Sequence, residues 1–259
     1  MLYRKLSSLL PAMVAATLLS GCGASDRGDR PLLQASAARH DTASDEGNAT
    51  TEIAVRTERI VHHAITATLF WVGEAADESN AFIANDRSAW DDFWQQHYGG
   101  VDTPDRTTLM PADFTPGENP FYIALPYNDF MEDGSRNPDA MAVIPWAGEK
   151  AWGEEASIVK NRWIALYDPE HNRTAYAQWE DAGPFVYDDA AYLFGGAAPR
   201  NRRNDAAGID LSPAVWIYLG YDTRSGENRA KIDWYFVDAD AVPEGPWKRI
   251  VTTRQTSWE

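Results

Sequence analysis

The sequence has one cysteine in 259 residues, Cys22. A chain with a single cysteine forms no internal disulfide and no thiolate metal cluster. It also lacks a Gly-x-Ser-x-Gly nucleophile motif, a glycine-rich nucleotide-binding motif and an internal repeat. The adjacent histidines His62 and His63 would point to opposite faces of a strand, which is poor geometry for shared metal binding. We therefore predict no metal site and no cofactor.

Positive charge is scarce, because 23 Lys and Arg face 39 Asp and Glu and give a net charge of -16. Removal of residues 1–21, as argued below, takes away two positive charges and no negative ones, so the net charge goes from -16 to -18. A field of this sign repels phosphate backbones and anionic lipid headgroups. We therefore expect no nucleic-acid partner, and we expect any membrane attachment to depend on a covalent lipid.

The apolar run from Leu9 to Leu19 is too short to cross a bilayer as a permanent helix. It follows two basic residues and leads into Leu19-Ser20-Gly21-Cys22, which predicts a signal peptide over residues 1–21. This ending resembles the lipobox of bacterial lipoproteins, which implies cleavage before Cys22 and acylation of its thiol. By the same resemblance, Gly23 favours sorting to the outer membrane. The other interpretation of Cys22 is a buried core thiol.

The mature chain is predicted to have two parts. Residues 22–57 are rich in small and polar residues and nearly free of aromatic ones, so they cannot bury enough apolar area to offset the entropy of ordering them. We interpret them as a flexible tether that holds the domain away from the lipid. Residues 58–259 have the length of a single domain.

Within that domain the residue pattern predicts strands, one hairpin and two helices. Alternating β-branched and aromatic residues predict strands over 60–72, 121–125 and 231–237, and a hairpin over 162–179. A helix is expected over 86–98, capped by Asp86 and stopped by Gly99-Gly100. A short helix is expected to begin after Ser212 as N-cap, with Pro213 at its first position, and to end at Leu219-Gly220.

Two motifs in the second half of the chain carry a resemblance to a known family. Asp181-Ala182-Gly183-Pro184-Phe185 follows the hairpin, and Ile209-Asp210-Leu211-Ser212-Pro213 precedes the short helix. In this order they resemble the double-psi β-barrel of rare lipoprotein A, and the Asp-Leu-Ser-Pro form is similar to bacterial expansins. The resemblance covers residues 160–240 and extends in outline to Thr68-Leu69-Phe70-Trp71. It implies a mainly β fold, a double-psi-like six-stranded barrel with inserted helices and long loops.

The resemblance also implies action on cell-wall glycan, and on peptidoglycan in particular. Asp181 and Asp210 stand at the matching motif positions and are therefore the predicted catalytic residues. Glycosidic cleavage needs one protonated carboxyl to donate to the glycosidic oxygen and a second charge to stabilise the transition state or accept a proton. Burial and mutual proximity would separate their pKa values. The order of the motifs does not assign the acid, and the resemblance to endoglucanases that carry an acid at the Asp-Leu-Ser motif favours Asp210.

The chain differs from rare lipoprotein A at Ala182, where that family has arginine, and in lacking a histidine in 121–129. Asp129 is the acidic residue in that segment, and Tyr127 lies beside it. Trp179, two residues before Asp181, could stack on a sugar ring. We predict that Asp129, Tyr127 and Trp179 contact the substrate.

Each prediction has a structural alternative. Both motif aspartates could serve only to hydrogen-bond loop or helix-start amides, Asp129 could be a turn residue, and most tryptophans should be core. The expected protein is thus a lipid-anchored outer-membrane protein that faces the periplasm and cleaves or binds cell-wall polysaccharide. A non-catalytic polysaccharide-binding module and a structural envelope lipoprotein stay open as alternatives, and no protein partner is indicated.

Overall fold

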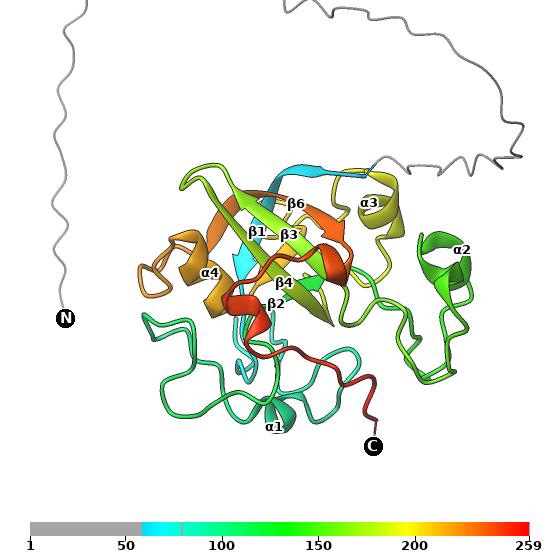
Figure 1. The fold of residues 1–259 in the computed structure, drawn as a ribbon, viewed down its shortest axis with the longest axis horizontal. Coiled ribbons are helices and arrows are strands. Elements are labelled where there is room, and N and C mark those ends of the chain that lie inside the picture. The colour runs from blue at the N-terminus through cyan, green and yellow to red at the C-terminus, as the bar shows by residue number, and fades with distance from the viewer. Residues whose placement is uncertain (1–58, 79, 259) are drawn as a thin grey trace, which may run out of the picture. The chain divides into compact units, whose positions relative to one another are not determined.

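The computed structural model describes residues 59–78 and 80–258, and its central feature is a closed barrel of six strands (Figure 1). The strands are β1 (His62–Leu69), β2 (Tyr122–Leu125), β3 (Trp163–Asp168), β4 (Arg173–Ala182), β5 (Ile209–Leu211) and β6 (Arg229–Val237). Their order around the barrel is β1-β5-β2-β4-β3-β6. The expected mainly β fold with a six-stranded barrel is confirmed. The predicted signal peptide, Cys22 and the tether lie outside the described residues.

The barrel mixes parallel and antiparallel pairs. β1 runs parallel to β5, and β2 runs parallel to β4, while the other neighbours are antiparallel. Alternate side chains along each strand point inward and form the main core, since successive residues of a strand face opposite sides. The inward residues include Ile65, Ala67, Ile123, Leu125, Ile164, Leu166, Ala175, Ala177, Ile209, Leu211, Ile232 and Trp234. Trp234 is fully buried, in agreement with the expectation that most tryptophans belong to the core.

The helices are short and lie outside the barrel. They are α1 (Trp94–Tyr98), α2 (Ala140–Val143), α3 (Ala190–Gly195) and α4 (Pro213–Leu219), with three 3-10 turns at Ala147–Glu149, Ala239–Ala241 and Pro246–Lys248. The α4 prediction is confirmed in detail, because the Ser212 hydroxyl accepts from Val215 N and Gly220 ends the helix with a left-handed φ of 112°. No described helix is long and apolar enough to cross a membrane.

The helix predicted over 86–98 is wrong in its first half. Only Trp94–Tyr98 is helical, and Asp86 does not cap it through its side chain. In the residues before α1, the Ser88 hydroxyl accepts from Trp90 N at 3.3 Å and the Asp91 carboxylate accepts from Phe93 N at 2.9 Å. Such side-chain bonds compete with helical hydrogen bonding. The expected stop at Gly99 is confirmed by its left-handed conformation.

A second hydrophobic cluster covers the outer side of β2. It consists of Phe70, Val72, Trp94, Tyr98, Tyr122 and Ala124, with Phe114 packed against it. Tyr122 fixes this layer through its hydroxyl, which accepts from Val72 N at 3.0 Å and donates to Asp102 at 2.8 Å. The chain between β1 and β2 is therefore folded back against the outer face of the barrel, and a cavity lies beside this contact.

Candidate functional site

One row of paired residues crosses the outer face of the barrel. Thr68 on β1 pairs with Asp210 on β5, Asp210 pairs with Ala124 on β2, and Ala124 pairs with Asp181 on β4. Paired residues of neighbouring strands point to the same face. Strands lie about 4.8 Å apart, so the backbones at the two aspartates are separated by about 10 Å. Ala124 between them is buried in the second hydrophobic cluster.

A bulge in β4 turns Asp181 toward this face. Ile123 pairs with Trp179, and the next residue of β2, Ala124, pairs with Asp181, so Glu180 is an extra residue in the strand. In a regular strand, Trp179 and Asp181 would share a face. The bulge separates them and sends Trp179 inward while Asp181 points outward.

The bulge explains why Trp179 does not lie where a predicted substrate contact should be. Its side chain is fully buried, packs edge-on against Trp90, and donates from its indole nitrogen to the Asp181 carbonyl at 2.8 Å. No face of the ring is open to a sugar. Trp179 instead supports the backbone of the bulge from within the core.

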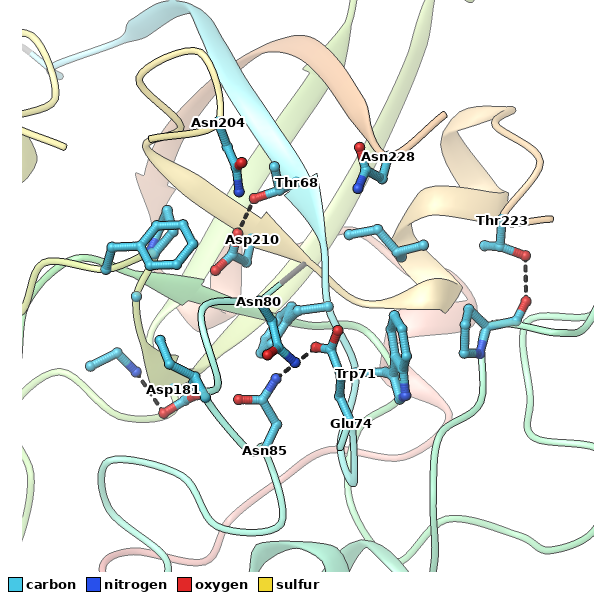
Figure 2. A pocket seen from close by; sticks show the side chains of 18 of the residues that line it. Thr68, Trp71, Glu74, Asn80, Asn85, Asp181, Asn204, Asp210, Thr223 and Asn228 are labelled. Atoms are coloured by element: carbon cyan, nitrogen blue, oxygen red, sulfur yellow. Dashed lines mark hydrogen bonds between the residues drawn. The ribbon is translucent and has the colours of Figure 1, made fainter. Parts of the chain in front are cut away.

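Both motif aspartates line one open cavity of about 270 Å³ (Figure 2). Its walls come from the end of β1, the loop after it, the loop after β4, and the loops before β5 and β6. The lining residues are Thr68, Leu69, Phe70, Trp71, Glu74, Asn80, Ile83, Asn85, Pro104, Asp181, Ala182, Gly183, Pro184, Phe185, Tyr187, Asn204, Asp210, Thr223, Gly226 and Asn228. The sequence motifs thus identified two carboxyl groups that the fold brings into the same cavity.

Asp210 is half-buried in the wall of the cavity. Its Oδ1 accepts a hydrogen bond from the Thr68 hydroxyl. Its Oδ2 faces Gly183, since a Cβ added there would lie 3.4 Å from it. Burial raises the pKa of Asp210 to about 8, and the nearby charges of Glu74 and Asp181 add to this effect. Asp210 therefore holds its proton at neutral pH.

The Asp181 side chain accepts two backbone hydrogen bonds, whereas that of Asp210 accepts one from a side chain. Asp181 Oδ1 accepts from Ala89 N at 2.7 Å and from Ala182 N at 2.8 Å, and the residue is 8% exposed. Burial raises its pKa to about 7, although the two backbone hydrogen bonds favour the ionised form. The bond to Ala89 also ties the loop before α1 to the strand that carries the site.

A third carboxyl group, Glu74, lines the same cavity and was not predicted from the sequence. It stands just after β1, where Gly73 turns the chain with a φ of 76°. The Asn85 amide donates to Glu74 Oε2 at 2.8 Å, and Asn80 forms a further side-chain hydrogen bond. Burial raises the pKa of Glu74 to about 7. An acidic residue after a glycine turn at the end of a barrel strand was the only available signal, and it is a weak one.

Several non-glycine residues in or beside the cavity lining have a left-handed backbone conformation. Phe185 and Asn204, both in its lining, have φ values of 59° and 50°. Ala81 and Phe82, between lining residues of another wall, have φ values of 57° and 62°. Left-handed conformations are unfavourable for residues with a Cβ and often occur at functional sites, where the surroundings enforce them. At Ala81, Phe82 and Phe185 the surroundings therefore hold the backbone in a conformation that the residue itself does not favour.

The structure places Asp129 and Tyr127 elsewhere. Asp129 is fully buried and accepts hydrogen bonds from Ile158 N at 2.6 Å, the Ser157 hydroxyl at 2.8 Å and Arg136 at 3.1 Å. These bonds fix the segment that leads into β3. Tyr127 is 2% exposed and packs edge-on against Phe194. Neither residue lines the cavity, which leaves them no surface for the predicted substrate contact.

No group of three or more His, Cys, Asp or Glu side chains among the described residues is arranged to hold a metal ion. No protein-family model matches the chain, and a search of the curated proteins finds no match.

The arrangement is suited to proton transfer. It combines a carboxyl group that is protonated near neutral pH with two further carboxyl groups in one cavity open to solvent. Amide and hydroxyl side chains line the remaining walls and can bind the hydroxyl groups of a sugar. Trp71 and Tyr187 add aromatic surface to the same cavity.

Proposed function

We propose that this chain is a lipid-anchored envelope protein that acts on cell-wall glycan, with peptidoglycan as its substrate. The observation that carries the proposal is that Asp210, Asp181 and Glu74 line one open cavity, in which burial raises the pKa of Asp210 to about 8. The motif resemblance to rare lipoprotein A points to the same substrate class. The barrel alone supports no such conclusion, because one fold serves many functions.

In the proposed reaction Asp210 donates its proton to the glycosidic oxygen as the bond to the sugar breaks. An ionised Asp181 or Glu74 stabilises the positive charge that develops on the sugar ring, or accepts a proton from the attacking hydroxyl group. Asn80 and Asn85 fix the Glu74 carboxylate, and Thr68 fixes the carboxyl group of Asp210. Pre-set hydrogen bonds of this kind reduce the reorganisation needed during the reaction.

The anchor is proposed from the sequence alone. Cleavage before Cys22 and acylation of its thiol would attach the domain to a membrane through lipid only, and Gly23 favours the outer membrane, facing the periplasm. The charge of -18 agrees with this, because an acidic surface gains nothing from anionic headgroups. Incorporation of a palmitate analogue by cells that express the chain, and its loss in Cys22→Ser, would test the anchor.

Digestion of purified peptidoglycan sacculi tests the activity. The protein is residues 22–259 with Cys22→Ser, and its products are separated and weighed by mass spectrometry. We expect wild type to release muropeptides and Asp210→Asn to reduce the rate at least about 100-fold while it stays folded. Glu132→Gln, which changes an exposed carboxylate outside the cavity, should match wild type. Unchanged release by Asp210→Asn would overturn the proposed role of this residue.

A non-catalytic polysaccharide-binding module is the second candidate. It is favoured by Trp71 and Tyr187, which give the cavity aromatic surface for a sugar. The two backbone bonds of Asp181 also suit a purely structural role for that residue. Co-sedimentation with sacculi without release of products, unaffected by Asp210→Asn, would favour the binding module over the enzyme.

A further inference from the structure

We infer that Arg203 and Arg229, at the rim of the acidic cavity, form a subsite for a carboxylate carried by the bound glycan. This inference rests on the proposed function and assigns the part of the substrate that lies next to the sugar in the cavity. Two sources of such a carboxylate exist in peptidoglycan, the lactyl group of a muramyl sugar and the free ends of its peptide.

The cavity itself is unsuited to an anion. Three carboxyl groups line it, and its lining, all within the described residues, contains no Lys, Arg or His. A carboxylate placed among Glu74, Asp181 and Asp210 would be repelled once these groups ionise. A sugar ring without charge fits the cavity, and any negative substituent must project from it.

Arg229 extends the row of paired residues that carries the site. It pairs with Thr68 on β1, and Thr68 pairs in turn with Asp210 on β5. The side chains of these three residues therefore leave the same face of the barrel. The backbone at Arg229 lies two strands from that at Asp210, about 10 Å away. A substituent on a sugar whose glycosidic oxygen meets Asp210 can reach a long arginine side chain from there.

Arg203 approaches the same rim from the loop before β5. Its guanidinium lies 5.1 Å from the centre of the Phe185 ring, which lines the cavity. Arg229 contacts Asn204, another lining residue, with 3.5 Å between its guanidinium nitrogen and the amide oxygen. The two exposed arginines thus touch neighbouring parts of the wall from outside.

Neither arginine has a carboxylate partner within salt-bridge distance among the described residues. Asp205, the residue after Asn204, forms an ion pair with Lys231 at 2.9 Å, and the charge of Arg229 also contributes to lowering the pKa of Asp205. In a chain with net charge -16, two cations without an ion-pair partner beside an acidic cavity are an unusual feature. Guanidinium groups bind carboxylates in a planar, two-point geometry, which makes arginine a selective partner for this ligand.

The test compares glycans of equal length that differ only in charge. The ligands are chito-oligosaccharides, peptide-bearing peptidoglycan strands, strands stripped of peptide so that the lactyl carboxylate is free, and stripped strands whose carboxylates have been converted to amides. Binding to residues 22–259 with Cys22→Ser and Asp210→Asn is measured by calorimetry, since the second change prevents turnover. Arg203→Gln, Arg229→Gln and the double variant are compared with Arg249→Gln, an exposed arginine outside the cavity.

We expect at least one carboxylate-bearing strand to bind about tenfold more tightly than its amidated form or a chito-oligosaccharide. The double variant should lose this preference and keep its affinity for chito-oligosaccharides, and Arg249→Gln should change nothing. A preference for stripped strands identifies the lactyl carboxylate as the ligand, and a preference for peptide-bearing strands identifies the peptide. Equal binding of all ligands, or equal weakening of all of them by the arginine variants, overturns the subsite. If no glycan binds, both the proposed function and the carboxylate subsite are overturned.

Discussion

Asp210→Asn should stabilise the domain increasingly as the pH rises. The pKa of Asp210 is about 8 in the folded protein against 3.8 for a free aspartate. Between these two pH values the unfolded chain releases the proton and the folded protein retains it, so ionisation favours unfolding. The aspartate therefore costs no stability below about pH 4, and its cost grows as the pH rises from 3.8 to about 8. Asparagine keeps an oxygen that can accept from Thr68 and removes the titration.

The size of this effect follows from the pKa difference and from the exposure of the site. At about 1.4 kcal/mol per unit, a change from 3.8 to about 8 sets a ceiling of about 6 kcal/mol. Asp210 is only half-buried and faces a cavity open to water, so screening reduces the penalty. We expect Asp210→Asn to raise the free energy of unfolding by about 2 kcal/mol at pH 8 and by less than about 0.5 kcal/mol at pH 4.

Urea unfolding, followed by tryptophan fluorescence at pH values from 4 to 9, measures this difference. Glu132→Gln serves as the control, because it removes an exposed carboxylate outside the cavity, and its difference from wild type should stay flat. A difference for Asp210→Asn that is independent of pH would refute the assignment of a raised pKa. A difference that falls with rising pH would show that the folded protein favours the ionised form. Gain of stability with loss of activity is a common pattern when a functional group is buried at a cost in stability.

Five further substitutions test how the site is supported. Lys160 and Glu180 form a buried ion pair at 2.5 Å, so Lys160→Met should cost about 3 to 5 kcal/mol in urea unfolding, and Lys160→Met with Glu180→Met should restore much of the loss. Ser212→Ala should lower the free energy of unfolding by about 1 kcal/mol, since it removes the N-cap of α4. Trp179→Ala should lower the free energy of unfolding by about 3 to 5 kcal/mol, because this side chain is fully buried. Trp71→Ala changes a residue of the cavity lining, so it should leave the melting temperature within a few degrees of wild type and weaken glycan binding in a sedimentation assay.

Local signals in the sequence were sufficient for several parts of the fold. The hairpin of β3 and β4 and the capped helix after Ser212 depend on residues that are close in the chain, and both agree with the structure. The helix over 86–98 failed for an equally local reason, because Ser88 and Asp91 offer the backbone hydrogen bonds that compete with helix formation. The apolar periodicity of that segment reflects burial and not helix formation, because Trp90 lies in the main core and Trp94 in the second hydrophobic cluster.

The composition of the site could be predicted only in part. Asp181 and Asp210 stood in recognisable motifs, and the structure brings both into one cavity. Glu74 and Arg229 had no motif of their own. Arg229 joins the site because antiparallel pairing of β6 with β1 sets it opposite Thr68. Glu74 joins because the chain after β1 folds back on the barrel. Both facts depend on contacts between distant segments, which a single sequence does not specify.

The bulge in β4 shows how one extra residue changes the meaning of a motif. Spacing alone places Trp179 and Asp181 on one face, which suggested a tryptophan platform beside a catalytic acid. With Glu180 as the extra residue, Trp179 fills the core and Asp181 reaches the cavity, while the Glu180 side chain forms the buried pair with Lys160. Deletion of Glu180 makes Trp179 and Asp181 successive residues of a regular strand, so Asp181 should stay paired with Ala124 on the outer face. The expected defect is the loss of the Glu180 partner of the buried Lys160. Deletion of Glu180 combined with Lys160→Met, which removes the unpaired charge, should therefore fold and keep glycan binding in a sedimentation assay. A folded double variant that does not bind glycan would show that the bulge itself is needed to position Asp181.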